Sequence, residues 1–152
     1  MDNLSKKKID IEIYQMDKNI NVHNFLFDLC KSEEEPNVEI KDSAGMFLHS
    51  FYNGIENIAS TILKDIGEDI SKDFQWHTNL LNKIFNSTED RPAILKDEYK
   101  EQLKKYMSFR HRIRHTYSYN VDWDDAKPLV EGSIELWENI KNDIHNFMKI
   151  FA

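Results

Sequence analysis

Apolar residues recur at helical spacing along almost the whole chain, in steps of three and four positions. The first stripe is interrupted only by His23 and predicts one amphipathic helix over residues 5–30. A second stripe predicts a helix over residues 40–66, and Gly67 follows it where a left-handed C-terminal cap is expected. The two stripes consist of Ile9, Ile13, Met16, Ile20 and Phe27, and of Ala44, Leu48, Phe51, Ile55, Ile58, Ile62 and Ile66.

Three further helices are expected in the second half of the chain. A shorter helix over residues 72–85 precedes the polar turn "NSTEDRP", and Pro92 suits the first turn of the next helix. Asp124 or Asp125 is expected to cap the last helix. The residues expected to face the core from the last two helices are Tyr99, Leu103, Tyr106 and Ile113, then Val130, Ile134, Trp137, Ile144, Met148 and Phe151.

These patterns predict an all-α protein built as an antiparallel bundle of four or five helices. The chain has 152 residues and 40% hydrophobic content, which is sufficient for one core, and no linker divides it. We therefore expect a single domain over residues 1–152. It would consist of the N-terminal helix over 5–30 and a core bundle over 40–151.

The charge is unevenly distributed along the chain. The net charge is −7, yet residues 100–115 hold six Lys or Arg side chains and one Glu, so a polyanion would have to bind there. A single cysteine excludes an internal disulfide and fits a reducing compartment. No stretch reaches the length of a membrane span or has the form of a signal peptide, so we expect a cytoplasmic protein without a membrane partner.

Arg110 occupies a core-facing position of the fourth helix, between Tyr106 and Ile113. A guanidinium in such a position requires a partner, because burial of an unpaired charge is unfavourable. One interpretation is a structural ion pair with a carboxylate on a facing helix, for example Glu56. The other is a functional role at an interface or a ligand, and periodicity alone does not separate them.

His111 and His115 are four residues apart, which is also the histidine spacing of zinc hydrolases. Arg112 replaces the Glu expected after the first histidine, and three guanidinium groups flank the pair, so we expect neither a metal nor another cofactor. Arg110 and His115 lie about 140° apart around a regular helix. They can meet at one atom only if the helix ends between them or if two copies pair.

If Arg110 and His115 converge, they provide the groups needed for RNA cleavage without a metal. Arginine holds a phosphate and stabilises the charge that develops on it, and histidine exchanges a proton near neutral pH. The 2′-hydroxyl would attack the adjacent phosphate and leave a cyclic phosphate end. Tyr117, Tyr119 and Trp123 could stack on bases, although ordinary packing explains each of them as well.

The sequence resembles the HEPN superfamily of small helical proteins, and within it the HepT-like toxins. Its motif is Arg110, four residues, His115, one residue, Tyr117, an Arg-x4-His-x-Tyr pattern. The resemblance covers about residues 40–150. It includes the segments "FYNGIENI", "WHTNLL", "RPAIL" and "FRHRIRHTY". One position differs, since the better-known HepT pattern has Asn directly after the arginine and this chain has His111.

The resemblance implies an HEPN-like fold and a homodimeric endoribonuclease toxin that cleaves RNA in a cleft at the two-fold interface. Arg110 and His115 would be its catalytic residues. It further implies an MntA-like nucleotidyltransferase as antitoxin, with Tyr117 as the residue that accepts AMP. Supporting residues would be His111, Glu56 and Asn53, and RNA-binding residues would be Arg112, Arg114, Lys104 and Lys105.

Two other interpretations remain open at this point. The bundle could be a non-catalytic HEPN accessory subunit of a nucleotidyltransferase that binds a nucleotide or a nucleic acid. Alternatively, residues 100–115 could be a solvated basic face used only in helix packing. An ion pair between Arg110 and Glu56 inside one monomer would favour this last interpretation. His77, next to Trp76, is expected to pack at a helix end.

Overall fold

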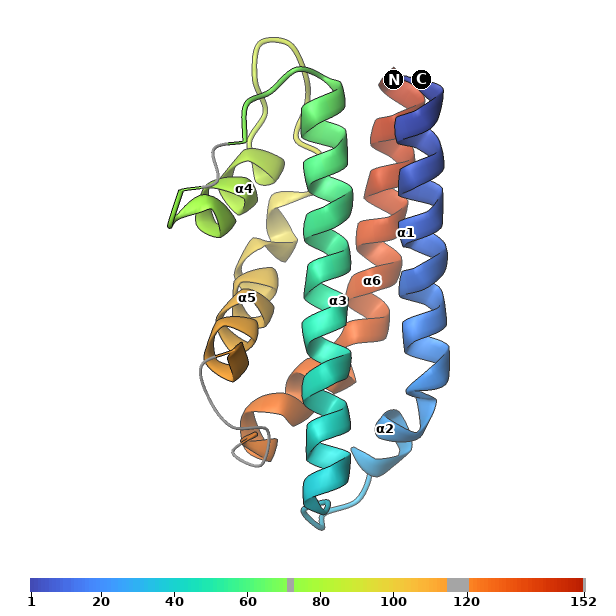
Figure 1. Cartoon of the computed structure of the whole chain (residues 1–152), viewed down its shortest axis with the longest axis vertical. Coiled ribbons are helices and arrows are strands. Elements are labelled where there is room, and N and C mark those ends of the chain that lie inside the picture. Colours follow the sequence, from blue (N-terminus) through green and yellow to red (C-terminus); the bar gives the residue numbers. More distant parts are fainter. Residues whose placement is uncertain (71–72, 115–120, 152) are drawn as a thin grey trace.

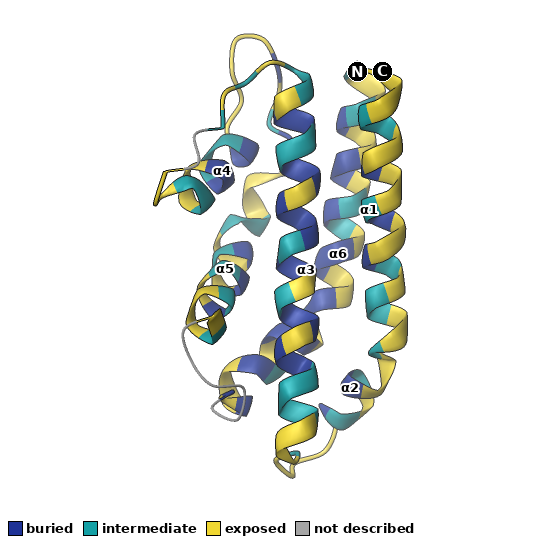
Figure 2. Cartoon of the chain, viewed as in Figure 1, coloured by how far each residue is buried: buried dark blue, intermediate teal, exposed yellow. Residues whose placement is uncertain are grey.

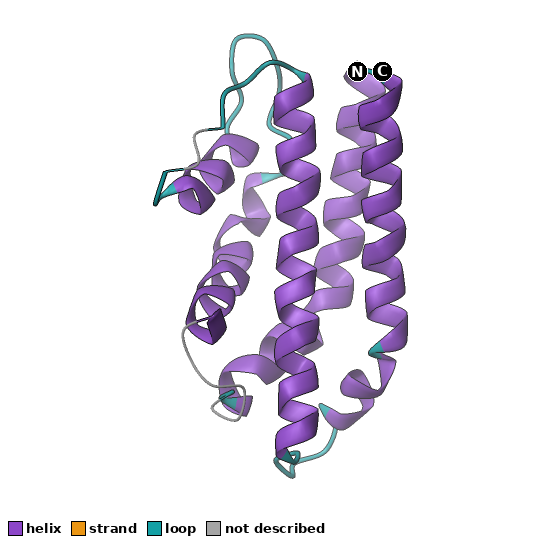
Figure 3. Ribbon diagram, in the orientation of Figure 1, coloured by secondary structure: helices purple, strands orange, loops and turns teal. Residues whose placement is uncertain are grey.

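The structure is a computed structural model and describes residues 1–70, 73–114 and 121–151. These residues form α-helices and one short 3-10 helix, and no strand occurs among them (Figure 3). The prediction of an all-α bundle is therefore confirmed. The elements are α1 (Asn3–Val22), α2 (Asn24–Leu29), α3 (Val38–Asp65), α4 (Trp76–Phe85), η1 (Asp97–Tyr99), α5 (Lys100–Arg114) and α6 (Trp123–Phe151).

Helix α3 lies at the centre of the bundle. It packs against α1 and α6 on one side and against α4 and α5 on the other (Figure 1). Helices α1 and α5 run antiparallel to α3, whereas α6 runs in the same direction as α3 (Figure 1). Because α3 has neighbours on several sides, it has buried residues along its length from Ala44 to Leu63 (Figure 2). The largest fully buried side chains of the core include Trp137, Tyr52, Tyr106, Phe47 and Phe51.

The single helix predicted over residues 5–30 is wrong, because the helix breaks at His23. His23 ends α1 and precedes α2, and its Nδ1 lies 2.8 Å from the carbonyl oxygen of Asn19. A side chain that bonds a nearby carbonyl competes with the helical backbone bond. The His23 ring also packs on Phe47, with 5.4 Å between ring centroids. The break turns the chain so that α2 contacts α6.

The predicted cap at Gly67 is confirmed. Gly67 has a φ of +82°, a conformation that side chains with a Cβ rarely adopt. Its N–H donates to the Lys64 carbonyl, and the N–H of Glu68 donates to the Leu63 carbonyl at 2.9 Å. These two bonds form a Schellman motif, which satisfies the last carbonyls of α3.

The two helices that follow begin later than the sequence predicted. Helix α4 starts at Trp76 instead of residue 72, and α5 starts at Lys100, well after Pro92. Between them the only regular element is the short η1, and the chain before it buries Ile94 and Leu95, whose N–H groups both donate to the Ile84 carbonyl. Pro92 therefore does not open a helix. The burial of Ile94 and Leu95 outweighs the local preference of Pro92 for the first turn of a helix.

Helix α6 is capped by Asp122, not by Asp124 or Asp125 as predicted. The Asp122 carboxylate accepts a hydrogen bond of 3.0 Å from the N–H of Asp124. Pro128 lies inside α6, and the first part of this helix runs at an angle to the rest (Figure 1). A proline removes one backbone hydrogen bond and bends a helix, which explains the change of direction.

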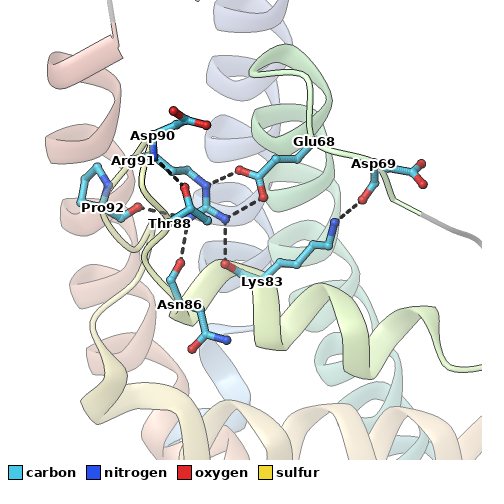
Figure 4. Close-up of polar contacts among 8 residues, drawn as sticks. All are labelled: Glu68, Asp69, Lys83, Asn86, Thr88, Asp90, Arg91 and Pro92. Atoms are coloured by element: carbon cyan, nitrogen blue, oxygen red, sulfur yellow. Dashed lines mark hydrogen bonds and ion pairs between the residues drawn. The ribbon is translucent and has the colours of Figure 1, made fainter.

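A buried arginine holds the chain at the ends of α3 and α4. Arg91 donates to both carboxylate oxygens of Glu68 and to the carbonyls of Lys83, Asn86 and Pro92 (Figure 4). Its side chain is 2% exposed. The last carbonyls of α4 thus find a donor, and the segment before α5 is fixed to α3.

No helix in the described residues is long and apolar enough to cross a bilayer.

Candidate functional site

The basic end of α5 and the beginning of α4 form the walls of one groove. The groove has a volume of about 750 Å³. We call it the Arg110 groove. One wall is cationic, and the other is mainly aromatic and polar. The lining residues are Met107, Ser108, Arg110, His111, Arg112 and Arg114 from α5, and Asp73, Phe74, Gln75, Trp76, His77 and Thr78 from the opposite side.

Arg110 lies half-buried on the cationic wall of this groove. Its Nε is buried and has no hydrogen-bond partner among the residues that the structure describes. A buried donor without a partner is unfavourable by about 1–3 kcal/mol. Because Nε itself is not accessible to solvent, a ligand in the groove would meet the exposed remainder of this half-buried side chain.

The ion pair between Arg110 and Glu56 that would favour a purely structural role is not formed within the described chain. The carboxylate of Glu56 instead lies 2.6 Å from Nδ1 of His77. Glu56 is 5% exposed, and the side chain of His77 is 23% exposed. Burial of a carboxylate requires a partner, and α4 provides it.

The rings of Trp76 and His77 are in contact, tilted against each other, at the beginning of α4. Their ring centroids are 3.8 Å apart, with 32° between the ring planes. Together with the bond to Glu56, this contact fixes the orientation of the imidazole. The expectation that His77 packs at a helix end is correct, and the structure adds its pairing with Glu56 of α3.

Two further side chains of α3 experience the charges of this site. Burial lowers the pKa of His49, and the nearby charges of Arg110 and Arg114 lower it further. Burial raises the pKa of Tyr52, and the carboxylate of Glu56 adds to this effect. The Tyr52 hydroxyl has no partner at hydrogen-bonding geometry among the described residues, although Glu56 is close enough to influence its ionisation.

The structure brings some of the residues expected in the site together and separates others. Arg110, His111, Arg112 and Arg114 line the Arg110 groove. Asn53, whose amide lies 3.3 Å from His49, lines a different groove between α1 and α3. Lys104 and Lys105 line a third groove, between α5 and the beginning of α6.

Two of the basic side chains have acidic partners on the surface. Arg112 lies 3.6 Å from the carboxylate of Asp125, and Lys104 lies 3.2 Å from Glu101. Both pairs are solvated, so each contributes little to stability. They leave Arg110 and Arg114 as the arginines of the groove without a carboxylate within ion-pair distance in the described part of the molecule.

His115 and Tyr117 lie outside the described residues. Helix α5 ends at Arg114, so the described helix stops directly before the motif histidine. The predicted convergence of Arg110 with His115 therefore stays a prediction. The same applies to the AMP acceptor role of Tyr117.

His77 is the residue of this site that sequence reasoning missed. A histidine beside a tryptophan at the start of a helix has no periodic signal of its own. The available signal was Glu56, a carboxylate close to the apolar stripe of α3 that needed a partner from another helix. Spacing could not show that this partner is His77.

The fold and the position of the basic helix define the class of this protein as an all-α bundle of HEPN type. Residues 43–151 match a family model described as HepT-like protein. The chain therefore belongs to the HepT-like family. No curated protein and no solved structure shows a significant match to the chain. The matched region begins in α3 and agrees with the extent of the resemblance seen in the sequence.

Proposed function

We propose that this protein is the toxin of a toxin–antitoxin pair and that it cleaves RNA without a metal ion. Its membership of the HepT-like family, which is generally of the HEPN nuclease type, provides the context. The observation that carries the proposal is the half-buried Arg110, which lines an open groove and has no carboxylate within ion-pair distance among the described residues. That arrangement fits a phosphate-binding arginine.

The proposed reaction is an internal transesterification of RNA. His115 accepts the proton of a 2′-hydroxyl, whose oxygen attacks the adjacent phosphorus. The new bond joins the 2′-oxygen to phosphorus, and the bond from phosphorus to the 5′-oxygen of the next nucleotide breaks. Arg110 stabilises the additional negative charge on the phosphate oxygens. The products are a 2′,3′-cyclic phosphate and a 5′-hydroxyl end.

The proposal includes a homodimer and a regulatory partner. Because Arg110 and His115 point in different directions on a regular helix, pairing of two copies would complete the site. An MntA-like nucleotidyltransferase would inactivate the toxin by transferring AMP to Tyr117. A phosphate group two residues from His115 would repel the RNA backbone. RNA in the cytoplasm would be the substrate.

A cleavage assay with purified protein and a chelator tests this function. Wild-type protein is expected to cleave single-stranded RNA in the presence of EDTA, and the His115→Ala and Arg110→Ala variants are expected to be inactive while remaining folded. His145→Ala provides a control, because His145 is an exposed histidine of α6 that does not line the groove. Binding of RNA without any cleavage would overturn the proposal and favour the non-catalytic accessory subunit.

A further inference from the structure

The aromatic wall of the Arg110 groove contains a second histidine in a defined orientation. His77 lines the groove opposite the arginines of α5. Its Nδ1 is directed to the buried carboxylate of Glu56 at 2.6 Å, and its ring contacts the ring of Trp76. A histidine whose Nδ1–H donates to a carboxylate presents the opposite ring nitrogen, Nε2, to other groups. The imidazole is therefore positioned before any ligand binds.

This arrangement combines a buried orienting carboxylate with a partly exposed imidazole. Glu56 is 5% exposed and His77 is 23% exposed, so the pair extends from the core to the surface of the groove. Carboxylate–imidazole pairs of this form serve as proton-transfer devices in enzymes, where the carboxylate fixes the tautomer and the orientation of the ring. Since the bond to His77 also satisfies the buried carboxylate, the access of the ring to the groove is the feature that allows a chemical role.

Several charged and titratable groups surround His77. Glu56 approaches from α3, and Asp73 precedes α4 on the same wall. Arg110, His111 and Arg114 line the groove from α5. The groove therefore holds guanidinium groups on one wall and an oriented imidazole on the other. A phosphodiester between these walls would meet both a charge-stabilising group and a proton-transfer group.

The proposed cleavage reaction needs two proton transfers. His115 takes the proton of the attacking 2′-hydroxyl, but the departing 5′-oxygen must also gain a proton, since an alkoxide is a poor leaving group. We propose that His77, oriented by Glu56, is the general acid of this reaction. This inference rests on the proposed function. Nε2 of the protonated ring gives its proton to the 5′-oxygen as the bond from phosphorus to that oxygen breaks, and His77 remains neutral until it takes up a proton from water.

The decisive test compares two RNA substrates that differ in one atom. In the second substrate, sulfur replaces the bridging 5′-oxygen at the cleavage site, and a thiolate departs without protonation. We expect His77→Gln to slow cleavage of ordinary RNA by about 10²–10⁴-fold, the usual contribution of a general acid. The same variant should cleave the sulfur substrate within several-fold of the wild-type rate.

Further variants separate a chemical role from a structural one. Glu56→Gln should show the same substrate dependence with a smaller loss, because the ring stays bonded but loses its carboxylate partner. His115→Ala should be inactive on both substrates, since the attacking hydroxyl still needs its base. His145→Gln should behave as wild type on both, and circular dichroism should show that the four variants retain the helical fold.

The outcomes distinguish this inference from the proposed function. If wild-type protein cleaves RNA and His77→Gln is unaffected, or is slowed equally on both substrates, the general acid role is overturned while the nuclease function stands. If wild-type protein cleaves neither substrate, the proposed function itself fails, and this inference fails with it. Restored cleavage of the sulfur substrate by His77→Gln is the supporting result.

Discussion

Glu56 on α3 and His77 on α4 are 21 residues apart in the sequence, and a hydrogen bond of 2.6 Å joins their side chains. This bond links the central helix to the helix that forms one wall of the Arg110 groove. It also provides the partner that the buried carboxylate of Glu56 requires.

The pair should be energetically coupled. We expect Glu56→Gln and His77→Gln each to lower the free energy of unfolding, and the double variant to lose less than the sum of the two. The coupling free energy should be about 1–3 kcal/mol, as found for side chains in direct contact. Urea denaturation of the four proteins measures it. If the loss in the double variant equals the sum of the two single losses to within about 0.5 kcal/mol, the pairing is contradicted.

The ionisation of His49 should report the position of Arg110 without any activity assay. Burial lowers the pKa of His49, and the charges of Arg110 and Arg114 lower it further. Arg110→Gln removes one positive charge and should raise this pKa, which should stay below its ordinary value because burial persists. NMR titration of the imidazole measures the change. Arg112→Gln is the control, and an equal shift in both variants would argue against the location of Arg110.

The ion pair between Arg91 and Glu68 should stabilise the fold at neutral pH. Arg91→Ala leaves Glu68 without its main partner (Figure 4). The backbone carbonyls that accept hydrogen bonds from the Arg91 side chain, such as that of Lys83, lose their donor as well. Since the arginine side chain is buried, we expect a loss of about 3 kcal/mol in the free energy of unfolding. Asp90→Asn, an exposed neighbour, should change it by less than about 0.5 kcal/mol.

The same pair should make stability depend on pH. The hydrogen bond from Arg91 lowers the pKa of Glu68 in the folded state and outweighs the opposite effect of burial. A carboxylate whose pKa is lower in the folded protein contributes fully above its unfolded pKa, and this contribution disappears as the pH falls through the folded value. Wild type should therefore exceed Glu68→Gln in stability at pH 7, and the difference should shrink below about pH 4. A difference that stays constant between pH 7 and pH 3 would contradict this.

Gly54 should be coupled to Met16 across the contact between α3 and α1. A Cβ added at Gly54 would lie 2.2 Å from the Met16 sulfur, and Met16 is buried. Gly54→Ala should therefore destabilise the protein by about 1–3 kcal/mol through overpacking, despite its better helix propensity. With Met16→Ala as background, the same substitution should instead stabilise by up to about 1 kcal/mol. Thermal unfolding measures the effect of Gly54→Ala in both backgrounds. If the substitution changes stability in the same direction in both, the close contact is ruled out.

The local sequence was sufficient for features that depend on neighbouring residues. The spacing of apolar side chains gave the helical class and the extent of α3 within two residues, because periodicity reports which positions are buried. Gly67 identified the end of α3, since a left-handed cap needs only a glycine and the preceding turn. The motif around Arg110 indicated the family that the match over residues 43–151 then established.

Features that depend on contacts between distant segments were not accessible in this way. The late start of α5 differs from the prediction because tertiary packing buries Ile94 and Leu95 ahead of it. The break at His23 and the cap by Asp122 also differ from the prediction, because several neighbouring positions offer similar local hydrogen bonds. For Arg110, periodicity showed a charge in need of a partner but not that Glu56 is bonded elsewhere. The packing of α4 against α3 decided the pairing of Glu56 with His77. The spacing of residues along the sequence shows on which face of a helix a side chain lies, but not which residue of another helix it meets.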